Sequence, residues 1–191
     1  MTMQAAAVPA LKEWSAVVHA LLDGRQRILL RKGGIHEKRF EVAAQEFLLF
    51  PTVAHSHTQR VRPEHRDLLA AAALDSNDER VIVRAAAKVV AVVLVNRPDN
   101  LEAIGDLHIW TADSVRQDRL DFRPKHQLSV LIVQAIPVVQ PAELARTPDY
   151  AGCTSWVQLP VTGAVNFGLA APVHDAASLR EAAARVRDAV G

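Results

Sequence analysis

Apolar side chains near the start of the chain recur at the spacing of a helix that buries one face. The recurring positions are Leu11, Trp14, Val18, Leu21 and Leu22. Pro9 suits a first helical turn, and Gly24 supplies a stop. The pattern therefore predicts an N-terminal helix beginning at Pro9, preceded by a loose tail over residues 1–8.

Several later segments have the apolar and β-branched content of strands. They cover residues 26–32, 46–52, 81–95 and 127–140, with a shorter one at 156–159. The Val81–Val95 segment is ambiguous, because Ala85–Ala87 would also tolerate a helix. Its β-branched residues favour a long buried strand, which is the interpretation adopted here.

Helices are predicted after Pro63, from Thr111, and over residues 175–191. Thr111 can cap the first amides of its helix. The run from Ser178 to Glu181 has the spacing of a capping box. Strands and helices occur without a regular βαβ rhythm, which favours the α+β class. We expect a mixed, curved or barrel-like sheet with an N-terminal and a C-terminal helix.

Length and composition describe one folded domain over residues 1–191, with a core from 9 to 160 and a loop from 161 to 174. Half of the 191 residues are hydrophobic. Cys153 is the single cysteine, which suits a reducing compartment. The chain lacks a secretion signal, and its longest apolar run is shorter than the roughly 20 residues of a spanning helix. A cytoplasmic protein without a membrane segment is expected.

Charge is distributed unevenly along the chain. The formal net charge is +1, yet the segment from Arg25 to Arg66 holds nine basic and four acidic residues. The turn Arg31-Lys32-Gly33-Gly34 is its densest part, and lysines and arginines with exposed amides can bind phosphate. A solvated basic face without a partner is the competing interpretation. The spacing of a Walker loop is absent.

A second basic cluster follows the segment His108–Thr111. Its members are Arg116, Arg119, Arg123, Lys125 and His126. Trp110 beside them can stack on a nucleobase, although an ordinary core anchor is the preferred interpretation of a tryptophan next to an isoleucine. The proline in Arg123-Pro124-Lys125-His126 fixes a loop from which three cationic side chains project.

Enzymatic alternatives have weaker signals. Cys153 can act as a nucleophile only beside a base such as His55, His108 or His126, and a buried thiol packed under Trp156 is preferred.

A metal or a cofactor is not expected. His55 and His57 would face the same way on an extended segment, but neither a cysteine pair nor an HExxH spacing supports a metal site. A metal-dependent nuclease would need an Asp…Glu-x-Lys arrangement on strands, which is absent. Glu13, off the apolar stripe of the predicted helix, is interpreted as a solvated carboxylate.

Several segments resemble the family catalogued as domain of unknown function 1802, roughly from Leu11 to Leu159. They are Leu11–Trp14, Leu29–Ile35, Phe47–Thr52 with His55, His108–Thr111, Arg123–His126 and Gly152–Trp156. This family has no established activity. Its reported association with restriction-endonuclease-type domains implies a place in restriction–modification or DNA defence, by analogy alone.

The leading hypothesis is a nucleic-acid-binding or sensing module for DNA or RNA. Its predicted contact residues are Arg31, Lys32, Gly33, Gly34, Trp110, Arg123, Lys125 and His126. The alternatives are an enzyme, either a Cys/His hydrolase or a metal-assisted phosphodiesterase, and an adaptor that binds a protein partner. The sharpest structural expectation is that the Arg31–Gly34 turn faces the Arg123–His126 loop across one basic groove.

Overall fold

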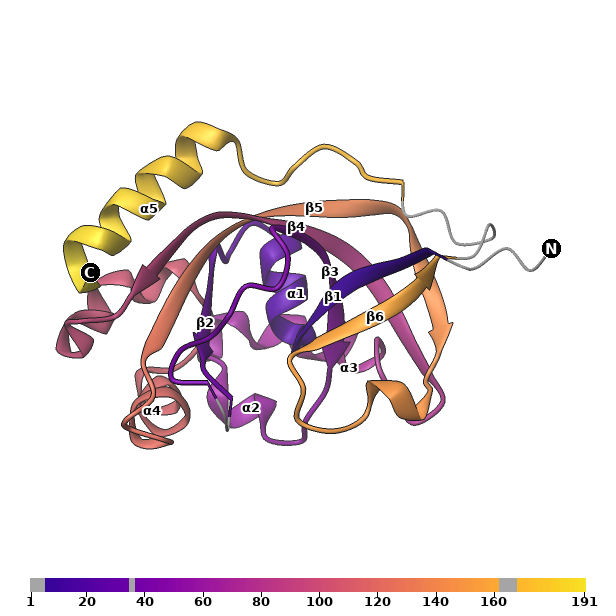
Figure 1. Cartoon of the computed structure of the whole chain (residues 1–191), viewed down its shortest axis with the longest axis horizontal. Helices are drawn as coiled ribbons and strands as arrows, with labels where there is room; N and C mark the ends of the chain where they lie inside the picture. Colours follow the sequence, from indigo (N-terminus) through magenta and orange to yellow (C-terminus); the bar gives the residue numbers. More distant parts are fainter. Residues whose placement is uncertain (1–5, 35–36, 162–167) are drawn as a thin grey trace.

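A computed structural model describes residues 6–34, 37–161 and 168–191 (Figure 1). Its centre is a six-stranded mixed sheet with the strand order β2-β5-β4-β3-β1-β6. The strands are β1 (Ala6–Trp14), β2 (Ile28–Lys32), β3 (Glu46–Thr52), β4 (Arg80–Leu94), β5 (Leu128–Ala145) and β6 (Trp156–Val161). β1 and β3 are parallel, and the other neighbours are antiparallel. The predicted α+β class with a mixed sheet is confirmed, and the sheet is open rather than a closed barrel.

The helices are short except for the last. They are α1 (Ser15–Leu22), α2 (His57–Arg60), α3 (Leu69–Ala73), α4 (Ala112–Val115) and α5 (Ala176–Val190). Three 3-10 segments, Pro63–Leu68, Pro98–Leu107 and Pro148–Tyr150, and one π-helical turn, Arg116–Asp121, complete the set. Figure 1 shows β4 and β5 arching across the molecule, with α1 inside the arch and α5 outside it.

The N-terminal prediction is wrong over its first half. Residues 9–14 belong to β1, and the helix begins only at Ser15. β1 pairs with β3 on one side and β6 on the other, so tertiary pairing overrides the helical spacing of its apolar residues. The predicted loose tail is corrected too, since residues 6–8 lie in β1; residues 1–5 are outside the described ranges.

The later elements follow the sequence pattern closely. The strand interpretation of the Val81 segment is confirmed by β4, and Glu46–Thr52 is β3 as predicted. The Thr111 hydroxyl accepts the Ser114 amide at 3.1 Å, which confirms the predicted cap. The cap of α5 is instead Asp175, whose carboxylate accepts the Ser178 amide at 2.7 Å, so the predicted capping box starts three residues too late.

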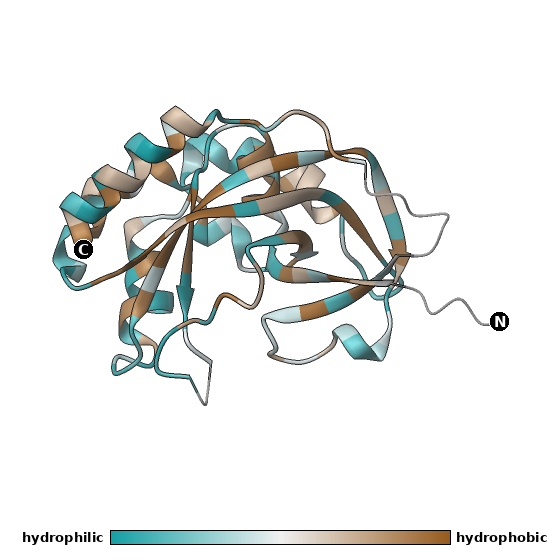
Figure 2. Cartoon of the chain, turned by 45° about the horizontal axis from the view of Figure 1, so that its top comes forward, coloured by the Kyte–Doolittle hydropathy of each residue, from teal (hydrophilic) through white to brown (hydrophobic). Residues whose placement is uncertain are grey.

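Two hydrophobic clusters pack on opposite faces of the sheet. Side chains alternate along β1, so Leu11 joins the larger cluster with α1 and α5, while Ala10 joins the smaller one with Phe50. Figure 2 shows the apolar residues concentrated along the long strands and an apolar stripe on α5. In the described part of the chain, none of the helices combines the length and apolar character that a membrane crossing requires.

Candidate functional site

The segments that carry the family resemblance meet around the end of β1. The Lys12 amide donates to the Ser155 carbonyl at 2.8 Å, and the Lys12 ammonium donates to the Gly152 carbonyl at 3.1 Å. On the other side, Trp14 lies opposite Thr52 of β3. Segments more than a hundred residues apart therefore hold Glu13 and Trp14 between them.

Glu13 is buried, with 4% of its surface exposed, so its interpretation as a solvated carboxylate is wrong. One carboxylate oxygen accepts the Trp14 amide at 2.8 Å, and the other accepts Arg31 Nη1 at 3.3 Å. The error follows from the helix assignment, because the alternation of a strand places Glu13 on the inner side with Leu11.

Arg31 is engaged on several sides. Besides Glu13, its Nη1 donates to the Lys12 carbonyl at 3.0 Å, and its guanidinium lies 5.0 Å from the centre of the Phe40 ring. Only 15% of the side chain is exposed. Arg31 is thus placed to hold Glu13 rather than to reach an outside phosphate.

Trp14 is the centre of an aromatic and cationic cluster. The His57 ring stacks on it at 4.0 Å between centroids, the Trp110 ring meets it edge-on at 4.6 Å, and the Arg60 guanidinium lies 5.2 Å from its centroid. Arg60 also pairs with Asp118 at 3.1 Å. Burial, aided by the charge of Arg60, lowers the pKa of His57 to about 4, so His57 is neutral at pH 7.

Two buried nitrogens in this region stand out. Across the described ranges, His57 Nε2 and Arg119 Nε have no hydrogen-bond partner. Burial lowers the pKa of Arg119, and the charge of Glu13 partly opposes that shift. Glu13 and His57, which are buried, form a polar cluster with the partly buried Arg60 and Arg119, and the sequence interpretation missed it.

The Arg31–Gly34 turn and the Arg123–His126 loop lie side by side. The Lys32 ammonium donates to the Phe122 carbonyl, and His126 Nδ1 lies 3.3 Å from the Gly33 carbonyl oxygen. The antiparallel pairing of β2 with β5 creates this proximity, because Lys32 lies opposite Leu128. The structure therefore brings together the two segments that the sequence singled out.

The glycines of this turn are less open than predicted. Gly33 is buried, and a Cβ there would lie 2.2 Å from the Glu37 carbonyl oxygen. Gly34 is exposed, but its amide points to the Glu37 carboxylate at 3.4 Å. A carboxylate in this position disfavours an anion, so the turn is not a ready-made phosphate cradle.

Beside the turn, an exposed aromatic ring lies against a guanidinium. Phe122 is 55% exposed, and the guanidinium of Arg123 lies 4.9 Å from its ring centre. Lys125 is exposed, as are Lys38 and Arg39, whose backbone is joined to Gln127. We call Lys38, Arg39, Phe122, Arg123 and Lys125 the basic loop surface. The predicted contact residues include Arg123 and Lys125 of this surface but not Lys38, Arg39 or Phe122.

Trp110 and His108 lie in the interior. Trp110 is 6% exposed and His108 is 4% exposed, and the Trp110 amide donates to His108 Nδ1 at 3.0 Å. Burial, followed by the charge of Arg62, lowers the pKa of His108 to about 4. The core-anchor interpretation describes the position of Trp110.

The enzymatic candidates are dispersed. Cys153 is exposed, so the prediction of a thiol buried under Trp156 is wrong. None of the hydrogen bonds in the described ranges joins it to a histidine. His55 is exposed and His57 is buried, so the two do not face the same way. Within residues 6–34, 37–161 and 168–191, no group of three or more His, Cys, Asp or Glu side chains is arranged to hold a metal ion.

The sequence pattern of the family described as "Domain of unknown function (DUF1802)" matches residues 10–185. The chain belongs to this family. No curated protein matches this DUF1802 chain.

Solved structures with similarity to the DUF1802 chain include ASCH from Zymomonas mobilis, at 14% identity and a TM-score of 0.41, covering 68% of this chain and 71% of that one. A tyrosine-to-phenylalanine mutant of the same protein gives 15% and 0.43, with coverages of 70% and 73%. A serine-to-alanine mutant gives 14% and 0.42, with coverages of 73% and 88%.

One signal in the sequence of this DUF1802 chain could have indicated this cluster. If the segment around Glu13 is assigned to a strand, the alternation of side chains places Glu13 on the same face as Leu11. The sequence gives no comparable signal for His57, Arg60 and Arg119. Their positions depend on a short helix and a π-helical turn, which no sequence pattern predicted.

Proposed function

We propose that the protein binds single-stranded nucleic acid through the basic loop surface. The observation that carries this proposal is the exposed Phe122 ring against the Arg123 guanidinium, near a backbone junction that joins Gln127 to the exposed Lys38 and Arg39. Aromatic rings stack on unpaired bases, and nearby lysines and arginines neutralise the phosphates. A duplex hides the faces of its bases, so this surface favours a single strand.

The predicted contact residues are revised accordingly. Arg123, Lys125 and His126 are kept, with Lys38, Arg39 and Phe122 added. Lys32 supports the loop by its bond to the Phe122 carbonyl, and Gly33 does so through its carbonyl oxygen beside His126. Three residues are removed from the predicted contacts. Arg31 is paired with Glu13, the Gly34 amide faces the Glu37 carboxylate, and Trp110 is buried.

The test is a fluorescence-anisotropy titration with labelled single-stranded RNA, single-stranded DNA and duplex DNA at several salt concentrations. We expect single strands to bind more tightly than the duplex. Affinity should fall with salt, with a slope of about −0.7 for each phosphate neutralised. If neither single-stranded RNA nor single-stranded DNA binds at low salt, the proposal is overturned.

Substitutions test whether the basic loop surface is where the nucleic acid binds. Phe122→Ala should weaken binding by about 1 to 3 kcal/mol, the range for one stacked base. Replacing Arg123 and Lys125 together by alanine should make the salt slope shallower by about 1.4 if each neutralises one phosphate. Arg180→Ala is the matched control, since Arg180 is exposed on α5.

A finer proposal is that this binding serves restriction or DNA defence inside the cell. Its support is the family resemblance only. It predicts that single-stranded DNA binds at least as tightly as RNA of the same length and that expressing cells restrict phage. Unchanged phage plating would count against it.

A further inference from the structure

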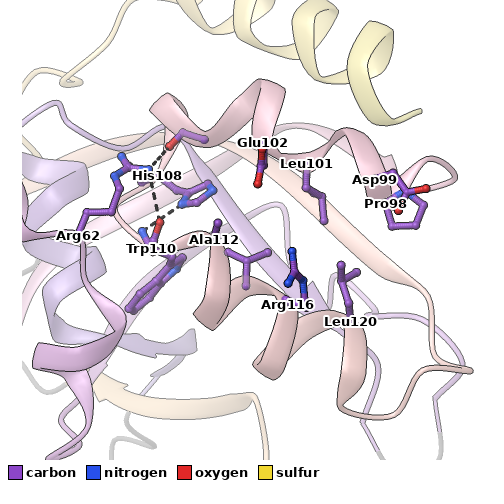
Figure 3. Close-up of a pocket in the computed structure, with 12 residues that line it drawn as sticks. Arg62, Pro98, Asp99, Leu101, Glu102, His108, Trp110, Ala112, Arg116 and Leu120 are labelled. Carbon is purple, nitrogen blue, oxygen red and sulfur yellow. Dashed lines mark hydrogen bonds between the residues drawn. The ribbon is translucent and has the colours of Figure 1, made fainter.

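A cavity of about 320 Å³ lies between the 3-10 helix Pro98–Leu107 and the segment from Ala112 to Leu120 (Figure 3). Leu101 and Glu102 line one wall, and Val115, Arg116 and Leu120 line the other. The volume lies in the range of small-molecule sites, and mostly apolar walls with few polar groups are typical of them.

Two opposite charges face one another across this cavity. Figure 3 shows the Glu102 carboxylate pointing into it from one wall and the Arg116 guanidinium rising from the other. Both residues are exposed at its mouth. In the part of the chain that the structure describes, neither side chain forms an ion pair with a neighbour, so both are free to meet a ligand.

The inner end of the cavity is held by a network of hydrogen bonds. Arg62 donates to the Gly105 carbonyl at 2.6 Å and to the His108 carbonyl, and His108 in turn accepts the Trp110 amide. These contacts tie the 3-10 helix to the residues that follow it (Figure 3). The cavity is therefore preformed, which lowers the cost of ordering it around a ligand.

The cavity and the basic loop surface are linked along the chain. Leu120 lines the cavity, and Phe122 follows two residues later. Enzymes and binding proteins that read single bases take them into pockets walled by apolar side chains.

We propose that this cavity receives one guanine base of a bound strand, with Glu102 on the base and Arg116 on its phosphate. A carboxylate offers two acceptor oxygens side by side. Among the common bases, guanine alone presents two adjacent donors on one edge, the ring N1–H and the exocyclic amine. This inference rests on the proposed function and gives it a base preference.

The experiment is a calorimetric titration of GMP, AMP, CMP and UMP into the full chain. GMP is expected to bind at least about tenfold more tightly than the others, since each retains at most one of the two hydrogen bonds. Guanosine without its phosphate should bind more weakly than GMP. Equal affinities for the four nucleotides, or no detectable binding, would overturn the inference.

Variants locate the site. Glu102→Gln should abolish the preference for GMP over AMP, because an amide offers one acceptor and a donor in place of two acceptors. Arg116→Ala should remove the difference between GMP and guanosine. Glu181→Gln, an exposed carboxylate on α5, is the matched control. All three positions are exposed, and thermal melts verify that the variants stay folded. A GMP preference that survives Glu102→Gln would also overturn the inference.

Oligonucleotides separate this inference from the proposed function. A guanine preference in single-stranded oligonucleotides that disappears in Glu102→Gln supports both. Salt-dependent binding without any guanine preference overturns the pocket alone. Binding of GMP without binding of any oligonucleotide overturns the proposed function and, with it, the strand-borne form of this site.

Discussion

Acidification is expected to destabilise the protein well above the pH at which carboxylates are protonated. His57 and His108 are 5% and 4% exposed, and burial lowers the pKa of each to about 4. In the unfolded chain a histidine has a pKa of about 6.5. Below that pH the unfolded state takes up protons that the folded state refuses, so stability falls from about pH 6.5 down to about pH 4.

The magnitude follows from the size of the shift. One pKa unit corresponds to about 1.36 kcal/mol, so each histidine should cost roughly 2 to 3 kcal/mol at pH 4.5. Together they remove roughly 5 kcal/mol, which equals the whole stability of a marginal domain. His65 and His174, whose pKa values burial also lowers, act in the same direction.

The assay is urea denaturation at pH 7.0, 6.0, 5.0 and 4.5, compared with a variant that carries His57→Phe and His108→Asn. Phenylalanine preserves the stack on Trp14, and asparagine preserves an acceptor for the Trp110 amide. The variant should start less stable but lose much less stability between pH 7.0 and 4.5. His55→Asn, at an exposed histidine, is the control.

An equal loss of stability in the double variant and the parent would refute the reasoning. So would a parent protein whose stability at pH 4.5 matches that at pH 7. In either case the two imidazoles would be accepting protons in the folded state, against their burial beside Arg60 and Arg62.

Three further outcomes are expected. Glu13→Ala leaves its arginine partner charged and mostly buried, and chemical denaturation should show a loss of about 3 kcal/mol; a loss near zero would contradict the role of the pair. Gly33→Ala should cost about 1 to 3 kcal/mol, because its Cβ would meet backbone, while Gly34→Ala should be nearly neutral in the same assay. Asp175→Ala should cost about 1 kcal/mol in thermal melts through the lost cap, and Ser178→Ala should cost less.

The fold was largely predictable from the sequence because its two longest strands are rich in β-branched residues. β4 and β5 are these strands. The cap of α4 was predictable too, because the Thr111 hydroxyl itself accepts the Ser114 amide. β1 was missed because its apolar positions satisfy a helical spacing, and only its pairing with β3 and β6 makes it a strand. The same wrong helix assignment also placed the Glu13 carboxylate on a solvated face, whereas the structure buries it.

The candidate site was predictable in part. The Arg31 turn and the loop near Arg123 could be singled out because both are dense in charge and contain glycine or proline, while their proximity comes from the pairing of β2 with β5. The exposure of Cys153 and Phe122 could not be predicted, because apolar character alone predicts burial for both side chains. The cavity beside Arg116 depends on how a 3-10 helix packs against a π-helical turn, and local sequence does not encode that packing.

The pairing of β1 with β6 has a consequence for the order of assembly. Ala6 lies opposite Val161, and Leu11 lies opposite Trp156, so β1 is completed by a strand that follows it by about 150 residues. Contacts this distant in sequence form slowly, since a long loop must close first. Glu13 and Trp14 are consequently flanked on both sides of β1 only after β6 has been synthesised, so a nascent chain displays its basic segments before this scaffold is complete.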